Sequence, residues 1–410
     1  MEKLFEFVTD HLNDDTARLI LDRKKHPEIE MDLAVACIES RRKLKGKVQE
    51  WYDESRLIFP LKLSAEQCSS SATGRYKADL AARIAEDKCW SIADLTGGLG
   101  VDSWFFSQKA ARVLYNEMQK PLYDAAGHNF KVLGADNITR SYTEVTKDSI
   151  SSVLENLDTD IIYMDPARRG EGGRKVFLIE ECTPDVLTLK DEIFRKVRHI
   201  LIKLSPMADI KMVCERLGNT CREVHVVATG GECKELLIWM DREYEGEPAI
   251  CAAELAQDPP ASVFSFTPSD ERSAVYQETS TPLHSWQGLF LFEPGKSLMK
   301  AGAFNLIAAR FDMKKLGKST HYYLTDSEDK AGQLKKYGKV FHVKEIASLD
   351  KRSMKDIGKR YNRAEVTARN IPMDTDTLRK RLGVTSGDDA HIFGLKSDKE
   401  GNVLIAASRI

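Results

Sequence analysis

The sequence predicts an α/β protein whose central part is a doubly wound, mostly parallel sheet. Between residues 89 and 245, short apolar runs alternate with helix-like segments, the order typical of βαβ units. A glycine turn, Thr96-Gly97-Gly98-Leu99-Gly100, joins the first apolar run to a helix. Residues 1–88 are mainly helical in pattern, and residues 285–410 mix strands with helices. We therefore expect an α/β domain between an N-terminal helical region and a C-terminal α+β region.

The segment 63–78 is more polar and less periodic than its surroundings, and it lies just before the first apolar run. It could fold over a pocket at the end of that strand. Four of its side chains would then be candidates to touch a cofactor or an incoming phosphate: Ser69, Ser70, Tyr76 and Lys77. The alternative is an ordinary helix start, capped by a serine or threonine and continuing to Glu86.

Composition limits the possible classes of protein. The chain has 410 residues with 42% hydrophobic content, which indicates roughly two to four globular domains. No apolar run approaches the ~18 residues of a membrane span, and the N-terminus does not look like a signal peptide. The eight cysteines form no C-x-x-C pair, so we expect reduced thiols in a cytoplasmic protein, without disulfides or a zinc site.

Charge is distributed unevenly along the chain. Residues 281–410 contain 24 Lys and Arg against 15 Asp and Glu, whereas the remaining residues contain 37 against 48. A basic C-terminal third on an acidic body suggests an anionic partner such as nucleic acid. A solvated basic surface without any partner is the alternative.

Three motifs follow three predicted strands. Asp94 opens the glycine turn after the first strand, and glycines at 97, 98 and 100 let the backbone approach a ligand closely. Glu117 ends the second strand, about 20 residues past the turn, where an acid is placed to bind a ribose diol. Asp165-Pro166-Ala167-Arg168 ends the strand 160–164. The turn lacks the G-x-G-x-x-G spacing of dinucleotide oxidoreductases.

Together these motifs resemble those of the class I S-adenosylmethionine-dependent methyltransferases. The resemblance implies a seven-stranded sheet that ends in an antiparallel hairpin, here residues 223–229 and 233–240. It implies that S-adenosylmethionine is the cofactor, bound by one set of residues: Asp94, Thr96, Gly97, Gly98, Gly100, Glu117 and an acid after the third strand. Asp148 matches that acid, which would hold the adenine amine, and Glu144 replaces it if the strand stops early. Either acid could instead be a helix cap or a solvated surface residue.

The same resemblance bears on the methylated atom. Carbon methylation of a pyrimidine requires a cysteine nucleophile, which many enzymes of this fold carry near the end of strand five. This chain has Leu204-Ser205-Pro206 there, so nitrogen methylation is favoured, with Asp165 and the Pro166 carbonyl as hydrogen-bond acceptors. An aromatic residue usually follows this motif, but Arg168 and Arg169 stand here. They could stack on a base or hold a phosphate, or they could form salt bridges with Glu171 or Glu180.

The C-terminal part resembles the ends of some bacterial methyltransferases. Phe292-Glu293-Pro294 and Ala301-Gly302 are similar to a ferredoxin-like module, and Tyr361-Asn362-Arg363 with Ala368 to Pro372 is similar to a THUMP-like domain. We therefore expect four domains: 1–88 helical, 89–284 methyltransferase with a terminal excursion of one or two strands, 285–338 ferredoxin-like and 339–410 THUMP-like. Because THUMP domains proper bind RNA, the resemblance implies an rRNA or tRNA partner.

The function expected is methyl transfer to a base nitrogen of RNA, with Asp165, Pro166 and Arg168 catalytic and Arg169, Tyr76 and Lys77 binding substrate. Two other functions fit the sequence. One is a methyltransferase that acts on a small molecule or a protein. The other is an RNA-binding protein that retains the fold without turnover. No His, Asp and Glu cluster has metal-ligand spacing, and the sequence does not determine the oligomeric state.

Overall fold

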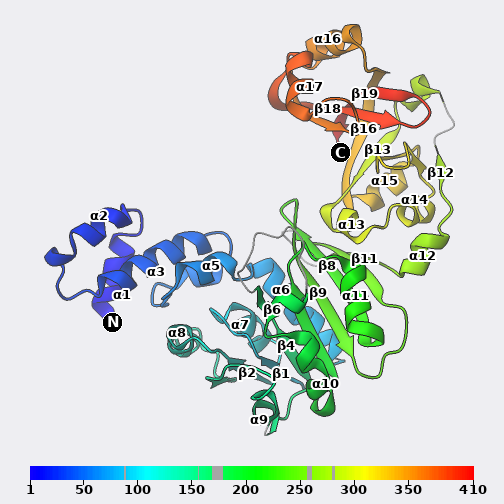
Figure 1. The fold of residues 1–410 in the computed structure, drawn as a ribbon. Helices are drawn as coiled ribbons and strands as arrows, with labels where there is room; N and C mark the ends of the chain where they lie inside the picture. Colours follow the sequence, from blue (N-terminus) through cyan, green and yellow to red (C-terminus); the bar gives the residue numbers. More distant parts are fainter. Residues whose placement is uncertain (87–88, 156, 169–178, 256–260, 279–281) are drawn as a thin grey trace. The chain divides into compact units, whose positions relative to one another are not determined.

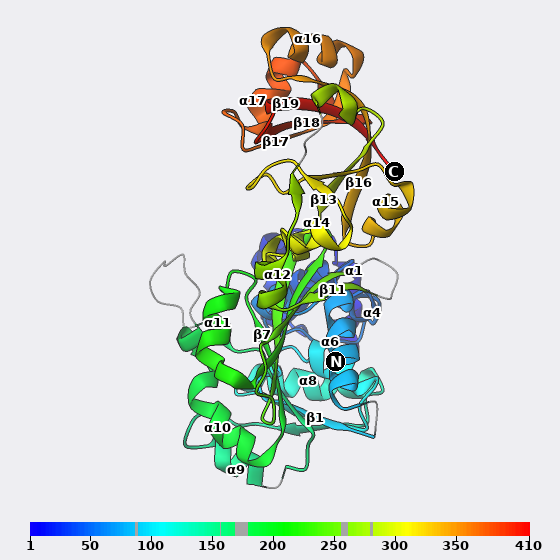
Figure 2. The same cartoon turned by 90° about the vertical axis from the view of Figure 1, so that its right-hand side faces the viewer.

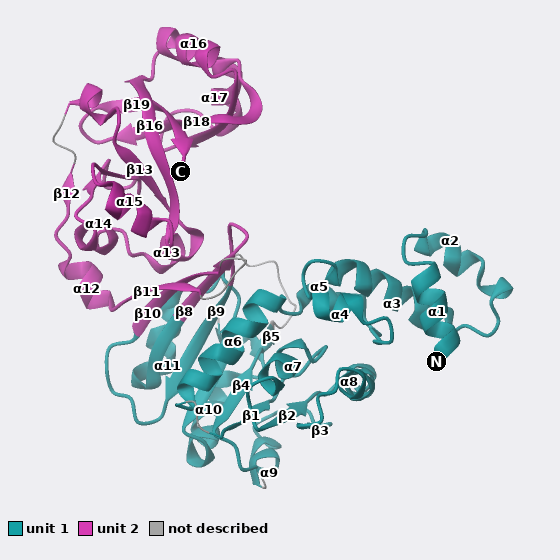
Figure 3. Cartoon of the chain, turned by 180° about the vertical axis from the view of Figure 1, so that it is seen from behind, with its two compact units in different colours: residues 1–224, 235–248 teal, residues 225–234, 249–410 magenta. Residues whose placement is uncertain are grey.

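The computed structural model describes the whole chain except residues 87–88, 156, 169–178, 256–260 and 279–281. It divides into two compact units (Figure 3). Unit 1 comprises residues 1–224 and 235–248, and unit 2 comprises residues 225–234 and 249–410. Among the described residues, no helix is long and apolar enough to span a bilayer.

The N-terminal region of unit 1 is helical, as expected. Asp15 caps the second helix, because its carboxylate accepts the amide of Ala17 at 2.9 Å. Helix α3 packs against α1, α2 and α5 and buries Ala34, Cys37 and Ile38. The six helices are α1 (Glu2–Asp10), α2 (Thr16–Leu21), α3 (Met31–Leu44), α4 (Gln49–Asp53), α5 (Lys62–Gln67) and α6 (Ser71–Ile84).

Five parallel strands form one end of the large sheet, in the order β7-β4-β1-β2-β3. Figure 2 shows α10 and α11 on one side of this sheet and α6 and α8 on the other. The strands are β1 (Ser91–Asp94), β2 (Arg112–Asn116), β3 (Ile138–Ser141), β4 (Ile161–Met164) and β7 (His199–Leu204). The helices between them are α7 (Val101–Ser107), α8 (Lys120–Val132), α9 (Ile150–Glu155) and α10 (Val186–Lys196), and α11 (Ile210–Leu217) follows β7.

The register places the ends of the first, second and fourth strands at one edge. Asp94 pairs with Tyr115 of β2 and with Tyr163 of β4, so Glu117 and Asp165 follow at the same level. Open α/β sheets bind ligands at the carboxyl edge of their parallel strands. The three acids singled out in the sequence therefore share that edge.

The sheet has nine strands, so the expected number of seven was wrong. The closing hairpin is present as β8 (Cys221–Thr229) and β9 (Glu232–Asp241), with β9 antiparallel to β7. Two further strands, β10 (Ala249–Leu255) and β11 (Ser262–Phe266), continue the sheet in the order β11-β10-β8-β9. They come from the proline-containing excursion, where one or two strands were expected.

The C-terminal part of unit 2 is a second, mixed sheet in the order β12-β14-β15-β13-β16-β19-β18-β17. Its strands are β12 (Gln277–Glu278), β13 (Phe290–Pro294), β14 (Lys314–Lys315), β15 (Tyr323–Thr325), β16 (Gly338–Ser348), β17 (Arg363–Arg369), β18 (Thr385–Ser397) and β19 (Gly401–Arg409). Its helices are α12 (Pro268–Ser273), α13 (Lys296–Ala301), α14 (Leu306–Arg310), α15 (Glu328–Leu334), α16 (Lys351–Arg360) and α17 (Thr375–Leu382). Helices α16 and α17 pack together over a core that includes Met354, Ile357 and Leu378 (Figure 1).

Candidate active site

The glycine turn is tied to the end of β2 by hydrogen bonds. The amide of Gly97 donates to the carbonyl of Asn116 at 2.7 Å, and the amide of Gly98 donates to Glu117 Oε2 at 2.8 Å. The hydroxyl of Tyr115 donates to the carbonyl of Gly98 at 2.7 Å. A Cβ atom on Gly97 would lie 2.2 Å from the ring of Tyr115, so only glycine fits there.

Asp94 lies below this turn and is 1% exposed. Its carboxylate accepts the Thr96 amide at 3.0 Å and the Ser103 hydroxyl at 2.6 Å. Burial raises the pKa of Asp94 to about 7, although both hydrogen bonds oppose that shift. The Thr96 hydroxyl accepts the amide of Asp165 at 2.6 Å, which fixes the end of β4 against the turn.

The three acids line one pocket of about 220 Å³. Every residue expected to bind the cofactor borders this pocket except Asp148: Asp94, Thr96, Gly97, Gly98, Gly100 and Glu117. Apolar side chains, among them Met118, Leu122 and Val145, supply part of the lining. A pocket with apolar walls and a few convergent polar groups is the usual form of a small-molecule site.

The acid after the third strand is Glu144 in this structure. Strand β3 ends at Ser141, and Glu144 borders the pocket, whereas Asp148 does not and is exposed. The sequence left Glu144 as the alternative to Asp148 if the third strand stopped early. The position of the strand end and the pocket lining favour Glu144. The role of this acid stays a prediction.

The sequence allowed two interpretations of the polar segment before β1: part of the pocket, or an ordinary capped helix start. Each interpretation holds for some of its residues. Ser64, Gln67, Cys68 and Ser69 border the pocket. Ser70 caps α6, because its hydroxyl accepts the amide of Thr73 at 3.2 Å. The remaining candidates of the segment, including Tyr76, lie within α6 and not in the pocket lining.

Lys77 is fully buried and is not placed to meet a substrate. Its ammonium group lies 2.7 Å from Glu235 Oε1, 2.9 Å from Ser69 Oγ and 3.4 Å from Asp102 Oδ1. Asp102 also accepts the Tyr163 hydroxyl at 2.8 Å. The side chain that the sequence suggested for substrate is therefore part of a buried ion-pair network beneath the pocket.

A second lysine, Lys203, was missed in the sequence. It lies near the end of β7, and its ammonium donates to Asp165 Oδ2 at 2.5 Å. Burial opposes its charge, but the nearby carboxylates of Asp165, Glu235 and Asp102 raise the pKa of Lys203 above its ordinary value. A lysine inside the apolar run His199–Leu204 was the available signal, since a strand of this kind seldom buries a charge without a partner.

The motif after β4 is described only in part. Pro166 is buried, and Asp165 borders the pocket. Arg168 belongs to the short strand β5 (Ala167–Arg168), which pairs with β6 (Cys182–Thr183). Arg169 lies outside the described residues. Glu180, one proposed salt-bridge partner, is instead 2.8 Å from Arg216.

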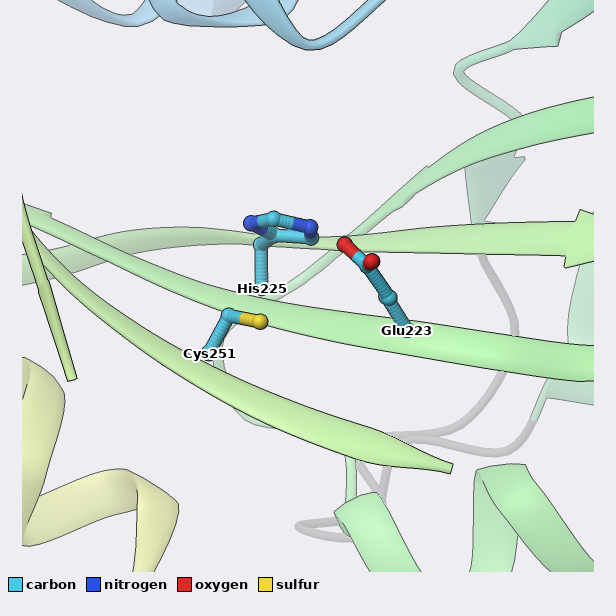
Figure 4. Close-up of side chains that lie close together, drawn as sticks. All are labelled: Glu223, His225 and Cys251. Atoms are coloured by element: carbon cyan, nitrogen blue, oxygen red, sulfur yellow. The ribbon is translucent and has the colours of Figure 1, made fainter. Parts of the chain in front are cut away.

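One group of possible metal ligands was not evident from sequence spacing. Figure 4 shows Glu223, His225 and Cys251, whose ligand atoms lie within 4.8 Å of one another. Glu223 also forms a salt bridge with Arg83 at 2.5 Å, and Cys251 accepts the Ser265 hydroxyl at 3.3 Å. These contacts of Glu223 and Cys251 are typical of structural side chains.

Two family models match the C-terminal part of the chain. A ferredoxin-like domain model matches residues 290–331, and a THUMP domain-like model matches residues 338–409. A crystal structure from Porphyromonas gingivalis W83, described as a putative methyltransferase, has a TM-score of 0.84 and 28% identity. The match covers 99% of this chain and 97% of that one.

Two other proteins are similar over shorter stretches. A tRNA/tmRNA (uracil-C(5))-methyltransferase of Shewanella oneidensis is 30% identical over 131 residues, which is 27% of this chain. The match spans about a third (35%) of that relative's length. A protein of Streptococcus mutans, described as a putative methyltransferase and solved in complex with SAH, is 13% identical, with a TM-score of 0.28 over 40% of this chain and 96% of that one.

The full-length similarity and the two C-terminal domain matches agree with the motif order and with the shared pocket. The chain is a methyltransferase-like protein whose C-terminal part carries a ferredoxin-like and a THUMP-like domain.

Proposed function

We propose that this protein is an S-adenosylmethionine-dependent methyltransferase that modifies a base nitrogen of RNA. The observation that carries the proposal is the convergence of Asp94, Glu117 and Asp165 on one pocket at the carboxyl edge of the sheet. The full-length similarity to a protein described as a methyltransferase supports it.

The residues of the pocket fit the cofactor. Gly97 and Gly100 border the pocket, and the absence of side chains lets the turn pack closely on Tyr115 and Phe130, where Cβ atoms would lie only 2.2 Å and 2.7 Å away. The Glu117 carboxylate would accept ribose hydroxyls, and Glu144 would accept the adenine amine. When bound, S-adenosylmethionine would supply a methyl group as an electrophile on sulfur, so the protein contributes position and electrostatics.

Nitrogen is a better acceptor atom than carbon in this site. Carbon methylation requires a thiolate, but the end of β7 carries Leu204 and Ser205. Cys68 borders the pocket, and burial raises the pKa of its thiol, which disfavours a thiolate. Asp165 can accept an N–H. A bound S-adenosylmethionine would supply the methyl group and keep the electrons of the carbon–sulfur bond, and the Asp165 carboxylate would accept the proton that the nitrogen loses.

RNA is supported by the second unit. In addition to the THUMP-like match, helices α16 and α17 expose several basic side chains: Lys351, Arg352, Lys355, Lys359, Arg360, Lys380 and Arg381. Such a group of cations suits phosphates, and its binding should weaken steeply with salt. Arg168 and Arg169 would contact the substrate base or its phosphate near the transfer site. The four domain ranges given above remain part of this proposal.

The test is transfer of a tritiated methyl group from S-adenosylmethionine to bulk RNA of cells that lack the gene, followed by mass spectrometry of the nucleosides. We expect one methylated nucleoside, absent from the deletion strain and restored by the wild-type chain. Asp165→Ala should abolish the transfer. Two results would contradict RNA methylation. One is tritium that appears only in protein or small molecules, and the other is cofactor binding without any methyl transfer.

A further inference from the structure

The Asp165 carboxylate has two different oxygens in this structure. Oδ2 accepts the Lys203 ammonium at 2.5 Å. Among the described residues, Oδ1 has no hydrogen-bond partner. Asp165 borders the pocket, and its side chain is 38% exposed, against 13% for Lys203. The lysine therefore stands behind the acid, and the free oxygen is presented to the pocket.

Lys203 belongs to a larger set of charges. Carboxylates face it from Asp165 after β4, Glu235 on β9 and Asp102 on α7, while Lys77 on α6 is the second cation. Asp94 on β1 and the Tyr163 hydroxyl on β4 also interact with Asp165, and the Cys68 thiol interacts with Lys203. Three carboxylates thus face two ammonium groups beneath the pocket, although burial raises the pKa of Glu235.

We propose that Lys203 is a positioning residue for methyl transfer, which holds Asp165 as an oriented anion so that Oδ1 accepts the N–H of a neutral amine. This inference rests on the proposed methyltransferase function and narrows its substrate. The Asp165 carboxylate would stabilise a nitrogen that becomes cationic as it gains the methyl group. It repels a nucleophile that is already an anion. An exocyclic amine of a nucleobase has the required chemistry.

The Lys203→Met variant tests this inference through the pH profile of the transfer. Without the ammonium group, the Asp165 carboxylate loses its paired cation while the nearby carboxylates remain, so its ionised form is disfavoured, most strongly at acidic pH. With bulk RNA from the deletion strain as substrate, we expect kcat of the variant to be at least tenfold below wild type at pH 6. The deficit should shrink to about threefold at pH 8.5, with the KM for S-adenosylmethionine nearly unchanged.

Two further variants separate positioning from folding. Lys203→Arg keeps the charge and should follow the wild-type profile, and Lys211→Met, which removes an exposed lysine paired with Glu215, should leave the rate unchanged. A Lys203→Met rate that falls by a constant factor at every pH would overturn the inference, because a purely structural role predicts that result. If the double variant Asp165→Asn with Lys203→Met denatures at no higher temperature than Lys203→Met alone, the pairing itself is refuted.

The two proposals fail in different ways. A wild-type chain that binds S-adenosylhomocysteine but transfers no methyl group to RNA would contradict the proposed function, and this inference with it. A wild-type chain that methylates RNA, with a Lys203→Met profile parallel to its own, would contradict this inference alone. Methylation of a nucleoside position that is anionic when it reacts would also overturn the choice of a neutral amine.

Discussion

The amide of Gly98 donates to Glu117 Oε2 at 2.8 Å, and this bond joins the glycine turn to the end of the neighbouring strand. The other oxygen of Glu117 accepts the amide of Gln119 at 2.7 Å. Glu117 is 6% exposed, so its carboxylate is held in one orientation before any ligand arrives. A pre-oriented acceptor saves the ordering cost that binding would otherwise include.

Glu117→Ala should weaken binding of S-adenosylhomocysteine by about 10- to 100-fold, because hydrogen bonds to a charged group contribute about 1.5–3 kcal/mol. Isothermal titration calorimetry measures this directly. Glu117→Gln keeps an oxygen for the Gly98 amide and should lose less. Equal affinity of Glu117→Ala and the wild-type chain would exclude a ribose contact.

The choice between Glu144 and Asp148 can be decided with the same titration. Glu144→Ala should raise the Kd for S-adenosylhomocysteine by about 3- to 10-fold, since one partly solvated hydrogen bond is lost. Asp148→Ala is the matched control and should leave the Kd unchanged, because Asp148 lies outside the pocket lining. The reverse result would restore Asp148 as the adenine acid.

The close approach of Gly97 to Tyr115 predicts a steric effect. A methyl group on Gly97 meets the ring of Tyr115 at 2.2 Å, and the ring is buried and held by its hydroxyl. Gly97→Ala should therefore lower the free energy of unfolding by about 1–3 kcal/mol and also displace the turn.

Chemical denaturation measures the effect of Gly97→Ala, with Gly332→Ala in α15 as the control. Nothing lies within 4 Å of a Cβ at Gly332, so that variant should gain up to about 1 kcal/mol from helix propensity. A Gly97→Ala protein as stable as the wild type, with unchanged affinity for S-adenosylhomocysteine, would show that the turn adapts to the larger residue.

The sequence predicted the local geometry around the pocket well, because the information is local there. Each strand end, glycine turn and following helix lies within about 20 residues, and the apolar runs mark the strands clearly. The strand number of the large sheet was underestimated because the one or two strands expected in the proline-containing excursion were not assigned to this sheet, which β10 and β11 (Ser262–Phe266) extend.

The ion pairs beneath the pocket could not be predicted in the same way. Lys77 and Glu235 are separated by 158 residues, and Lys203 and Asp165 by 38. A polar segment followed by a lysine has the same pattern whether the side chain faces solvent or a buried carboxylate. Only the tertiary arrangement distinguishes a substrate-binding lysine from a structural one.

Asp94 makes stability depend on pH. Its pKa is raised from 3.8 to about 7, so between these values the folded chain binds a proton that the unfolded chain has lost. Stability from this group is therefore present at low pH and decreases as pH rises towards 7. Asp94→Asn removes that dependence, and its stability relative to wild type should increase by up to about 3 kcal/mol between pH 5 and pH 8.

Thermal unfolding of the ligand-free chains at pH 5 and pH 8 measures the effect of Asp94→Asn. Asp158→Asn, which changes a 95% exposed acid in the same unit, is the control and should show no such increase. A constant difference between Asp94→Asn and wild type at both pH values would show that Asp94 is already ionised at pH 5.

Lys77 is expected to be essential for stability, because its removal leaves Glu235 and Asp102 buried without the ammonium group that contacts both of them. Both carboxylates are almost completely buried, at 2% and 9% exposure. Breaking a buried ion pair on one side costs about 3–5 kcal/mol, since the remaining charge is uncompensated. Lys77→Met should lower the free energy of unfolding by that amount, as measured by urea denaturation.

The matched control for Lys77→Met is Lys109→Met, which breaks an exposed pair with Asp79 and should cost less than about 1 kcal/mol. Adding Glu235→Gln to Lys77→Met should recover part of the loss, because it neutralises one of the stranded acids. Lys77 would instead be a substrate ligand if Lys77→Met were as stable as Lys109→Met and lost only RNA methylation. The buried contacts of the Lys77 ammonium group predict instead that Lys77→Met is less stable than Lys109→Met.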